Sequence, residues 1–323
     1  MKKFIITLLL ICLVLSFTAM TGVAKQLKFA YMPGIADPFM FMIEKGAKAK
    51  AAELGVELIV GEYPKAWGPE YQVPILKALV ARGDIDLLFV VPTSNEALIP
   101  VLKEISDSGI PVITVDCFIG DGDYTKPSDY SFPLSYIATD NFLGGQVVAG
   151  QLALLLGGKG KVFLENTSPD VSTSIDRESG FKAGLKIFPN MELVGVEYCL
   201  DVQETAATQV SEALQKNPDL DAVFGVNLFT AQGAHQAVVS AGLEGVVKIA
   251  TWDATETLIE ALKRKELSFI LAQMPGEIGA LSVEWGVKHL TEGVEIPKKI
   301  TPGFFIFTQE NVNDPEAQKY IYK

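Results

Sequence analysis

The chain has 323 residues, 49% of them hydrophobic, and its 27 basic and 39 acidic side chains give a net charge of −12. This length allows two domains of ordinary size. A surface with so much negative charge repels nucleic acid and anionic lipid, so we expect neither as a partner.

The first 24 residues have the three regions of a secretory signal peptide. Two lysines precede an apolar run over residues 4–17, and small residues follow up to Ala24. The apolar run is shorter than the ~20 residues of a membrane span, so the sequence predicts cleavage after Ala24 and not a permanent anchor. Because Cys12 lies inside the apolar run and not at the cut, we do not expect a lipoprotein. Cleavage lowers the net charge to −14, and we expect the mature protein in the periplasm or otherwise secreted.

Strand-like and helix-like segments alternate along the rest of the chain. Short apolar runs rich in β-branched residues predict strands at 27–31, 56–60, 86–91, 111–115, 134–138, 160–164, 192–198, 221–226, 247–252 and 268–272. Helices are predicted between them at 39–53, 71–81, 95–108, 142–156, 178–187, 204–216, 229–241, 255–264 and 276–291. This alternation favours parallel sheets with right-handed crossovers. Ten strands would crowd one sheet, so we expect two sheets of about five strands, each with its own core.

Polar or aromatic side chains follow five of the predicted strands. Ligands of open parallel sheets bind at the carboxyl ends of strands. Carboxylates accept hydrogen bonds from hydroxyls, amides both donate and accept, and an aromatic face covers the apolar side of a sugar ring. Such groups suit a neutral polyhydroxy ligand. The strand-end residues are Asp37, Phe39, Asp116, Cys117, Asn227, Trp252, Asp253 and Gln273.

Most of these residues also have a purely structural explanation. Asp37 stands before a proline, as a helix N-cap does when proline takes the first helical position. Asp253 is a candidate cap for the helix that follows it. Asn227 could simply start a helix, Phe39 and Trp252 could pack in the core, and Gln273 could be an exposed surface residue.

Two loops are candidates for the rim of a pocket. Residues 118–133 form the longest predicted loop and follow Asp116 directly, so they are either one lip of the pocket or a solvated surface loop. Trp67 lies in a loop after the second strand, where it either reaches over the cleft as a stacking platform or packs on its own domain.

The sequence contains no catalytic motif that we recognise. Both histidines, His235 and His289, lie inside predicted helices, and there is no Gly-x-Ser-x-Gly elbow, His-Glu-x-x-His motif, phosphate loop or cluster of metal ligands. A glycosidase needs a pair of carboxylates. The strand-end aspartates could form such a pair, so an enzyme that acts on a sugar stays an alternative. We expect a binding protein and not an enzyme, with no cofactor and no metal.

Seven segments of the chain are similar, in order and spacing, to a known family. They are ADPFMFMIEKGAKAKAAELGVEL, VVPTSNEALIPVLKEISDSGIPVITVDC, YIATDNFLGGQVVAGQLA, DRESGFKAGL, DLDAVFGVN, GVVKIATWDATE and ILAQMPGEIGALSVEWGVKHL. Through them the chain resembles the ribose-type (cluster B, class I) periplasmic sugar-binding proteins of ABC transporters over nearly all of residues 26–310. The resemblance implies the type I periplasmic binding fold, an α/β fold of two Rossmann-like lobes with parallel sheets joined by three hinge crossings. The implied N-terminal lobe is 26–139 plus 274–301, and the C-terminal lobe is 140–273 plus 302–323.

The same resemblance implies a function and partners. A small sugar would be captured between the lobes, which close around it, and would be delivered to an ABC permease and its ATPase. A sensory role toward a chemoreceptor is the alternative, and we expect a monomer in either case. Cys117 and Cys199 would lie on opposite lobes, so we expect free thiols. Transcription regulators share this core fold, but they carry a DNA-binding helix-turn-helix where this chain has a signal peptide.

Four positions depart from the pattern of ribose binders. Ribose binders have an asparagine at the position of Val91, arginines at Cys117 and Ile175, and a second aromatic at Met40. Losing two arginines removes bidentate, charge-assisted contacts, so ribose is not the ligand we expect. A deoxysugar, a polyol, a furanose signal molecule or a less polar ligand such as a nucleoside would fit such a pocket better.

Overall fold

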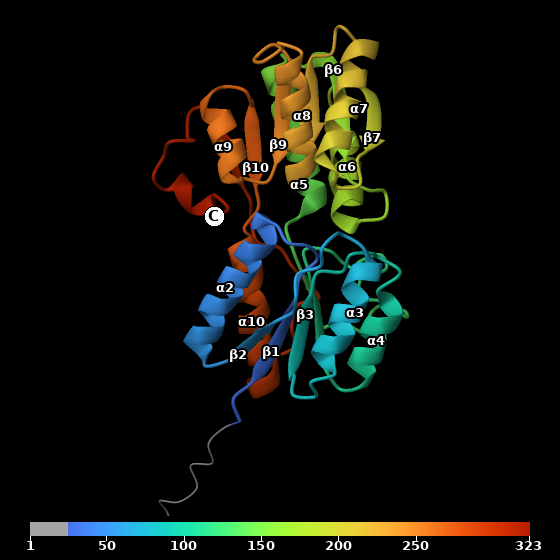
Figure 1. The fold of residues 1–323 in the computed structure, drawn as a ribbon, viewed down its shortest axis with the longest axis vertical. Coiled ribbons are helices and arrows are strands. Elements are labelled where there is room, and N and C mark those ends of the chain that lie inside the picture. The colour runs from blue at the N-terminus through green and yellow to red at the C-terminus, as the bar shows by residue number, and fades with distance from the viewer. Residues whose placement is uncertain (1–24) are drawn as a thin grey trace, which may run out of the picture.

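A computed structural model describes residues 25–323, and the predicted signal peptide lies outside these residues. The described chain forms two α/β lobes that stack end to end (Figure 1), each built on one six-stranded sheet. Within residues 25–323, no helix combines the length and the apolar character that a membrane span requires.

The N-terminal lobe has the strand order β11-β5-β4-β3-β1-β2, and every neighbouring pair is parallel. Its strands are β1 (Lys28–Met32), β2 (Glu57–Val60), β3 (Leu87–Val90), β4 (Val112–Val115), β5 (Ser135–Ile137) and β11 (Lys299–Ile300). Its helices are α2 (Pro38–Leu54), α3 (Pro69–Val80), α4 (Ile99–Asp107) and α10 (Pro275–Glu292).

The C-terminal lobe repeats this arrangement with the order β12-β10-β9-β8-β6-β7. Its strands are β6 (Lys159–Asn166), β7 (Asn190–Tyr198), β8 (Ala222–Gly225), β9 (Lys248–Trp252), β10 (Phe269–Ala272) and β12 (Phe305–Thr308). Its helices are α5 (Asn141–Leu155), α6 (Ser172–Leu185), α7 (Gln203–Lys216), α8 (Leu228–Ser240), α9 (Glu256–Lys263) and the 3-10 helix η1 (Ala317–Tyr320). The β10–β12 pair is antiparallel, and the other pairs are parallel.

The predicted strands and helices are all present, and the predicted fold class is confirmed. Two strands were not predicted, so each sheet has six strands and not about five. β11 has only two residues, too few for a periodic pattern, and β12 is an antiparallel edge strand beyond the last predicted βα unit. The first turns of α4 and α6 also differ, since α4 begins at Ile99 and α6 at Ser172, not at 95 and 178.

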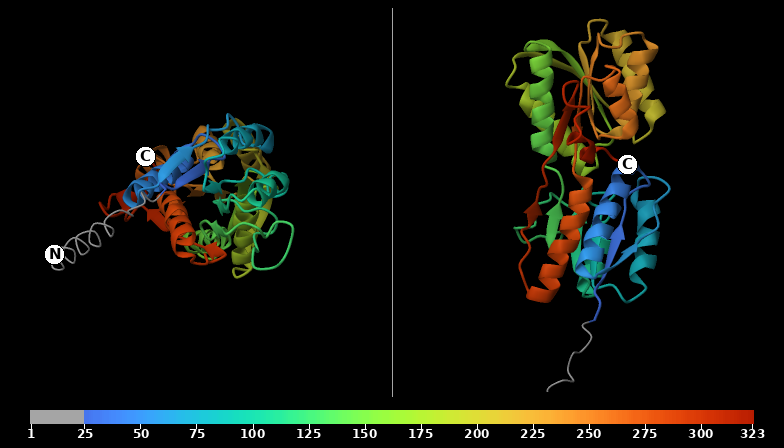
Figure 2. Two further views of the ribbon diagram at one scale, coloured as in Figure 1. Left: turned by 90° about the horizontal axis from the view of Figure 1, so that it is seen from below. Right: turned by 90° about the vertical axis from the view of Figure 1, so that its left-hand side faces the viewer.

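Within the described residues, the chain passes between the two sheets three times. The crossings join β5 to α5, β10 to α10, and β11 to β12. Figure 2 shows the C-terminal end of the chain at the junction of the lobes, close to these crossings. Each predicted boundary between the lobes falls within one of the three crossing segments. We therefore propose the lobe bounds that the sequence predicts.

Strand order places the carboxyl ends of both sheets at the junction of the lobes. In each sheet, successive strands are first added on one side and then on the other. This change of side falls between β1 and β3 in the N-terminal lobe and between β6 and β8 in the C-terminal lobe. A crevice forms outside the carboxyl ends of strands at such a reversal, and ligands bind there. The fold therefore brings two potential binding edges face to face.

Glycine allows two helices of the N-terminal lobe to pack closely. A Cβ atom added at Gly46 of α2 would lie 1.9 Å from the carbonyl oxygen of Gly276 on α10, and one at Gly279 would lie 2.0 Å from the carbonyl oxygen of Ile43. Neither glycine can therefore be replaced without separating the helices. Because α10 follows the second crossing, this contact ties a hinge segment to the first helix of the lobe.

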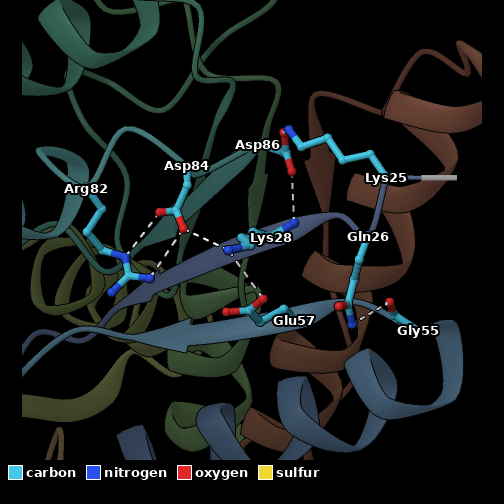
Figure 3. Close-up of polar contacts among 8 residues, drawn as sticks. All are labelled: Lys25, Gln26, Lys28, Gly55, Glu57, Arg82, Asp84 and Asp86. Atoms are coloured by element: carbon cyan, nitrogen blue, oxygen red, sulfur yellow. Dashed lines mark hydrogen bonds and ion pairs between the residues drawn. The ribbon is translucent and has the colours of Figure 1, made fainter. Parts of the chain in front are cut away.

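A network of charged side chains holds the amino end of β1, at the far end of the N-terminal lobe from the junction (Figures 1 and 3). The backbone N–H of Lys28 donates to Asp86 at 2.9 Å, and its Nζ pairs with Asp84 at 2.8 Å. Arg82 donates to Asp84 as well, at 3.2 Å. Solvent-exposed ion pairs add little stability, so this network mainly fixes where the strand begins.

Candidate ligand-binding site

A cavity lies between the two lobes at the carboxyl ends of their strands. It contains about 510 Å³ of empty space, part of it open to solvent. The N-terminal lobe contributes Asp37, Phe39, Met40, Trp67 and Asp116 to its wall. The C-terminal lobe contributes Arg177, Asp201, Asn227 and Asp253, and Gln273 lies at the second crossing.

The two lobes touch each other around this cavity. The backbone N–H of Phe118 donates to Ser172 Oγ at 3.1 Å, which joins the loop after β4 to the start of α6. On the hinge side, the ring of Phe39 meets the edge of Tyr322 with their centroids 5.9 Å apart. The described arrangement is therefore a closed one.

Two aspartates stand at the strand ends of the facing lobes. Asp116 follows β4 and Asp253 follows β9, and each is 5% exposed. Both have a left-handed backbone, with φ of 61° and 71°, a conformation that Asp adopts more readily than most residues other than glycine. Asp116 Oδ1 is buried and has no hydrogen-bond partner in the protein.

The neighbours of Asp253 come from the hinge. Gln273 Nε2 donates to Asp253 Oδ1 at 2.9 Å, and the hydroxyl of Tyr322 lies 3.3 Å from the same oxygen. That hydroxyl also accepts from the backbone N–H of Gln273 at 2.7 Å. Tyr322, close to the end of the chain, therefore holds two cavity residues in place, and no pattern in the sequence indicates this role.

A single buried arginine faces these carboxylates from α6. Arg177 Nε donates to Asn141 Oδ1 at 2.8 Å and its Nη1 donates to the carbonyl oxygen of Val226 at 2.7 Å. Its guanidinium lies 4.3 Å from the centre of the Trp252 ring, a cation–π contact. These three contacts fix the guanidinium before any ligand arrives.

The cavity collects four carboxyl groups against one guanidinium. Burial raises the pKa of Asp37 to about 7 and the pKa of Asp116 to about 6. Burial also raises the pKa of Asp201 and of Asp253. The nearby Arg177 offsets only part of this rise. A ligand rich in hydrogen-bond donors would stabilise the ionised carboxylates, so the cavity suits a molecule with several hydroxyl groups.

Two cavity residues also cap helices. Asp37 Oδ1 accepts from the backbone N–H of Met40 at 2.8 Å at the start of α2. Asn227 Oδ1 accepts from the first turn of α8, and its Nδ2 donates to Asp201 at 2.7 Å. Asp37 and Asn227 therefore cap helices and also line the cavity, and their contact with a ligand stays a prediction. α9 is capped by Thr255 and not by Asp253.

Eight of the eleven predicted site residues line the cavity, and Cys117, Ile175 and Trp252 do not. Trp252 is fully buried in the C-terminal lobe, where it supports Arg177. Cys117 is fully buried with its Sγ 3.6 Å from Asp116 Oδ2. Ile175 is 37% exposed and lines a separate polar hollow between the lobes. Asp116, Arg177 and Asp253, each within two residues of one of these three in the sequence, line the cavity instead.

The long loop folds onto its own lobe. Tyr124 is 3% exposed, and its hydroxyl lies 3.0 Å from both Thr114 Oγ1 and the backbone N–H of Ile119. Among the described residues that line the cavity, none belongs to 118–133. The loop is therefore neither a lip of this cavity nor a fully solvated excursion.

Sequence reasoning missed two charged residues of the cavity. Arg177 is one of only three arginines in the chain, and its sequence position marks it only as part of the family segment DRESGFKAGL. Asp201 lies three residues beyond the end of β7, and its left-handed backbone (φ 58°) resembles that of Asp116 and Asp253. An isolated arginine and an aspartate just past a strand were the signals available in the sequence.

The remaining cysteine and histidine side chains do not line the cavity. Cys117 and Cys199 are free, as expected, and both are buried. His235 Nε2 lies 2.9 Å from Glu266, and His289 Nδ1 lies 3.0 Å from a backbone carbonyl oxygen. Among residues 25–323, no cluster of His, Cys, Asp and Glu has an arrangement that could hold a metal ion.

Comparison with known proteins identifies the family. The model of the periplasmic binding protein domain matches residues 30–293. The chain belongs to this family. This periplasmic binding protein is 27% identical over 275 residues to the ribose import binding protein RbsB of Bacillus subtilis, an alignment that covers 85% of the chain and 84% of that relative.

Solved structures agree with this assignment. An ABC transporter solute-binding protein from Agrobacterium vitis, bound with alpha-D-tagatopyranose, is 40% identical with a TM-score of 0.89 and covers 92% of this chain and 100% of its own. A second one from Agrobacterium vitis, with bound D-fucose, is 25% identical with a TM-score of 0.83 and covers 91% and 100% of the two chains. This periplasmic binding protein therefore shares its whole two-lobed fold with sugar-bound solute-binding proteins.

Proposed function

We propose that this periplasmic binding protein captures a small neutral sugar between its lobes and delivers it to an ABC permease with its ATPase. The observation that carries the proposal is the facing pair of strand-end carboxylates, Asp116 and Asp253, one from each lobe of a single cavity. Sugar hydroxyls donate to such oxygens, and Arg177 and Asn227 supply donors for sugar oxygens. A ligand held in this way joins the two lobes.

Closure follows from the same contacts. Only contacts that are stronger in the closed form shift the balance between open and closed lobes, and residues contributed by opposite lobes act together only when the lobes are closed. Each hydrogen bond to a charged group contributes ~1.5–3 kcal/mol, and micromolar binding requires about 8 kcal/mol. Three or four such bonds and one apolar face therefore suffice, and hinge motion at the three crossings permits closure.

The relatives support a sugar over other ligands. The named relatives include ribose import binding proteins, a D-ribose/D-allose-binding protein and structures bound with alpha-D-tagatopyranose and D-fucose. The relative that is 40% identical holds a ketohexose. We therefore propose a hexose or pentose as the first ligands to test.

The cellular setting belongs to the same proposal. Residues 1–24 would be removed as a signal peptide, and the mature chain, not a lipoprotein, would act as a monomer in the periplasm or outside the cell. It would release its ligand unchanged, since its family consists of binding proteins and relatives are named as import binding proteins. Delivery to a permease is supported by relatives described as ABC transporter solute-binding proteins.

A thermal-shift screen tests the proposed function. The mature protein, starting at Lys25, is mixed with D-tagatose, D-ribose, D-allose, D-fucose and D-arabinose, with adenosine as a non-sugar comparison for the nucleoside alternative. A ligand that binds the folded state raises the melting temperature by mass action. We expect a dose-dependent rise with at least one sugar and a one-to-one titration by calorimetry. If no sugar raises the melting temperature, the proposed function is wrong.

A further inference from the structure

Trp67 covers the ends of two strands at the rim of the cavity. It lies in the loop between β2 and α3, and its six-membered ring fills the space above Gly34. A Cβ atom at Gly34 would lie 2.6 Å from Trp67 Cζ3 and 3.2 Å from Val91 Cγ1. Glycine after β1 and a small apolar residue after β3 therefore leave the space that the ring occupies.

The polar edge of this ring has no partner. Cζ3 lies across the six-membered ring from the carbon that carries Nε1, so the N–H edge is turned away from Gly34. Nε1 of Trp67 is buried and makes no hydrogen bond within the described chain. Buried indole N–H groups usually find an acceptor, and leaving a buried donor unpaired costs ~1–3 kcal/mol. The indole N–H therefore lacks an acceptor within the described chain.

Two acceptors in the same cavity are also unpaired. Asp116 Oδ1 and Gln273 Oε1 are buried without a partner in the described chain, and these side chains are only 5% and 2% exposed. A ligand that provides two donors and one acceptor would pair with these two oxygens and with Trp67 Nε1. A sugar meets both requirements, because its hydroxyls donate and its hydroxyl or ring oxygens accept.

The wall that carries Trp67 is fixed by a buried glutamine. Gln72, at the start of α3, is fully buried, and its Nε2 donates to the carbonyl oxygens of Pro33 at 3.0 Å and Val91 at 2.6 Å. Its Oε1 accepts from the backbone N–H of Thr93 at 3.1 Å. These bonds tie the start of α3 to the segments after β1 and β3, so the Trp67 loop is anchored before ligand binds.

We propose that Trp67 is a specificity-determining residue whose indole N–H donates to an oxygen of the bound sugar. The inference rests on the proposed function and deepens it, because it names a contact that selects among sugars. A sugar with an accepting oxygen at the rim binds tightly, and one without it leaves the Trp67 N–H unpaired. The indole acts here through its edge as a donor, and not only through its face as a stacking platform.

The test separates the N–H group from the shape of the ring. Trp67 is replaced in one variant by 3-benzothienylalanine, which keeps the bicyclic shape and carries sulfur in place of N–H, and in a second variant by phenylalanine (Trp67→Phe). Trp285→Phe is the matched control, because Trp285 lies on α10 outside the cavity. Calorimetry measures the affinity of each protein for D-tagatose, D-ribose, D-allose, D-fucose and D-arabinose.

Each outcome has one meaning. We expect both Trp67 replacements to weaken the tightest sugar of this panel about three- to tenfold, the value of one hydrogen bond, and Trp285→Phe to bind as the unaltered protein does. Equal affinity of the benzothienyl variant and the unaltered protein overturns the inference, while the proposed function stands. Absence of binding of all five sugars to the unaltered protein overturns the proposed function, and this inference with it.

Discussion

Asp116 and Asp253 occupy equivalent positions in the two lobes. β4 and β9 take the same place in the two strand orders, and each of these aspartates is the first residue after its strand. Both have a positive φ and the same 5% exposure. The two lobes thus present the same group in the same backbone conformation to a shared cavity, with Arg177 near both.

Removing either carboxylate charge should weaken sugar binding and leave the fold intact. Asp116→Asn and Asp253→Asn keep the side-chain shape, and asparagine tolerates the left-handed backbone. Each change replaces a charged acceptor with a neutral one, so we expect at least a tenfold loss of affinity by calorimetry and a melting temperature within about 3 °C. Asp107→Asn, at an exposed pair with Lys103, is the control and should change nothing. Unaltered affinity in both cavity variants would contradict the site.

Arg177 should support the fold as well as the site. Its buried guanidinium joins α6 to Asn141 and to the carbonyl oxygen of Val226. Arg177→Met leaves these acceptors unpaired and the aspartates without a counter-charge, so we expect the free energy of unfolding in urea to fall by about 3 kcal/mol. Arg264→Met removes only an exposed pair with Glu266 and should cost less than 1 kcal/mol. Equal losses in the two variants would argue against this role.

Two glycines of α5 provide a matched pair for the packing of Trp252. A Cβ atom at Gly144 would lie 2.3 Å from Trp252 Cη2, whereas one at Gly150 would meet nothing within 4 Å. Gly144→Ala should therefore destabilise the protein by about 1–3 kcal/mol through overpacking. Gly150→Ala should stabilise it by up to about 1 kcal/mol, because alanine is the better helix former. Urea unfolding measures both, and a stabilising Gly144→Ala would contradict the described contact.

Much of the fold could be predicted because local patterns and long-range structure agree. Buried parallel strands are short, continuous and apolar, so runs such as 86–91 and 111–115 stand out in the sequence. β11 was not predicted, because its two residues are held by pairing with β5, a contact between distant parts of the chain. Nothing local in residues 299–300 indicates that partner.

Site residues could be predicted from the sequence where they lie soon after the end of a strand. Asp37, Asp116, Asn227 and Asp253 follow strands closely, and a parallel sheet brings such residues to one edge. Side-chain direction could not be predicted, because it depends on what each turn places next to it. Trp252 therefore supports Arg177 from within the core and does not line the cavity.

Closure of the empty protein should depend on pH through Asp37. In the closed form burial and then repulsion from Asp253 and Asp116 raise the pKa of Asp37 from 3.8 to about 7. The closed form thus binds this proton more tightly than an open, solvated form does, so closure is favoured as the pH falls from about 7 toward about 4. Small-angle scattering of the ligand-free protein should show a smaller radius of gyration at pH 5 than at pH 8.

The control for this effect keeps the helix cap. Asp37→Asn still accepts from the Met40 N–H, because asparagine is an equally good N-cap, but it has no proton to exchange. The change in radius between pH 8 and pH 5 should shrink in this variant, with a remainder from Asp116, whose pKa is raised to about 6, and from Asp201 and Asp253, whose pKa is raised as well. The same pH response in both proteins would show that Asp37 is not involved.

A crystal structure of the mature protein with the tightest-binding sugar of the panel tests the central claim most directly. We predict one sugar in the cavity between the lobes, with its oxygens within hydrogen-bond distance of both the Asp116 and the Asp253 carboxylates. A sugar bound to one lobe alone, or outside this cavity, would contradict the account.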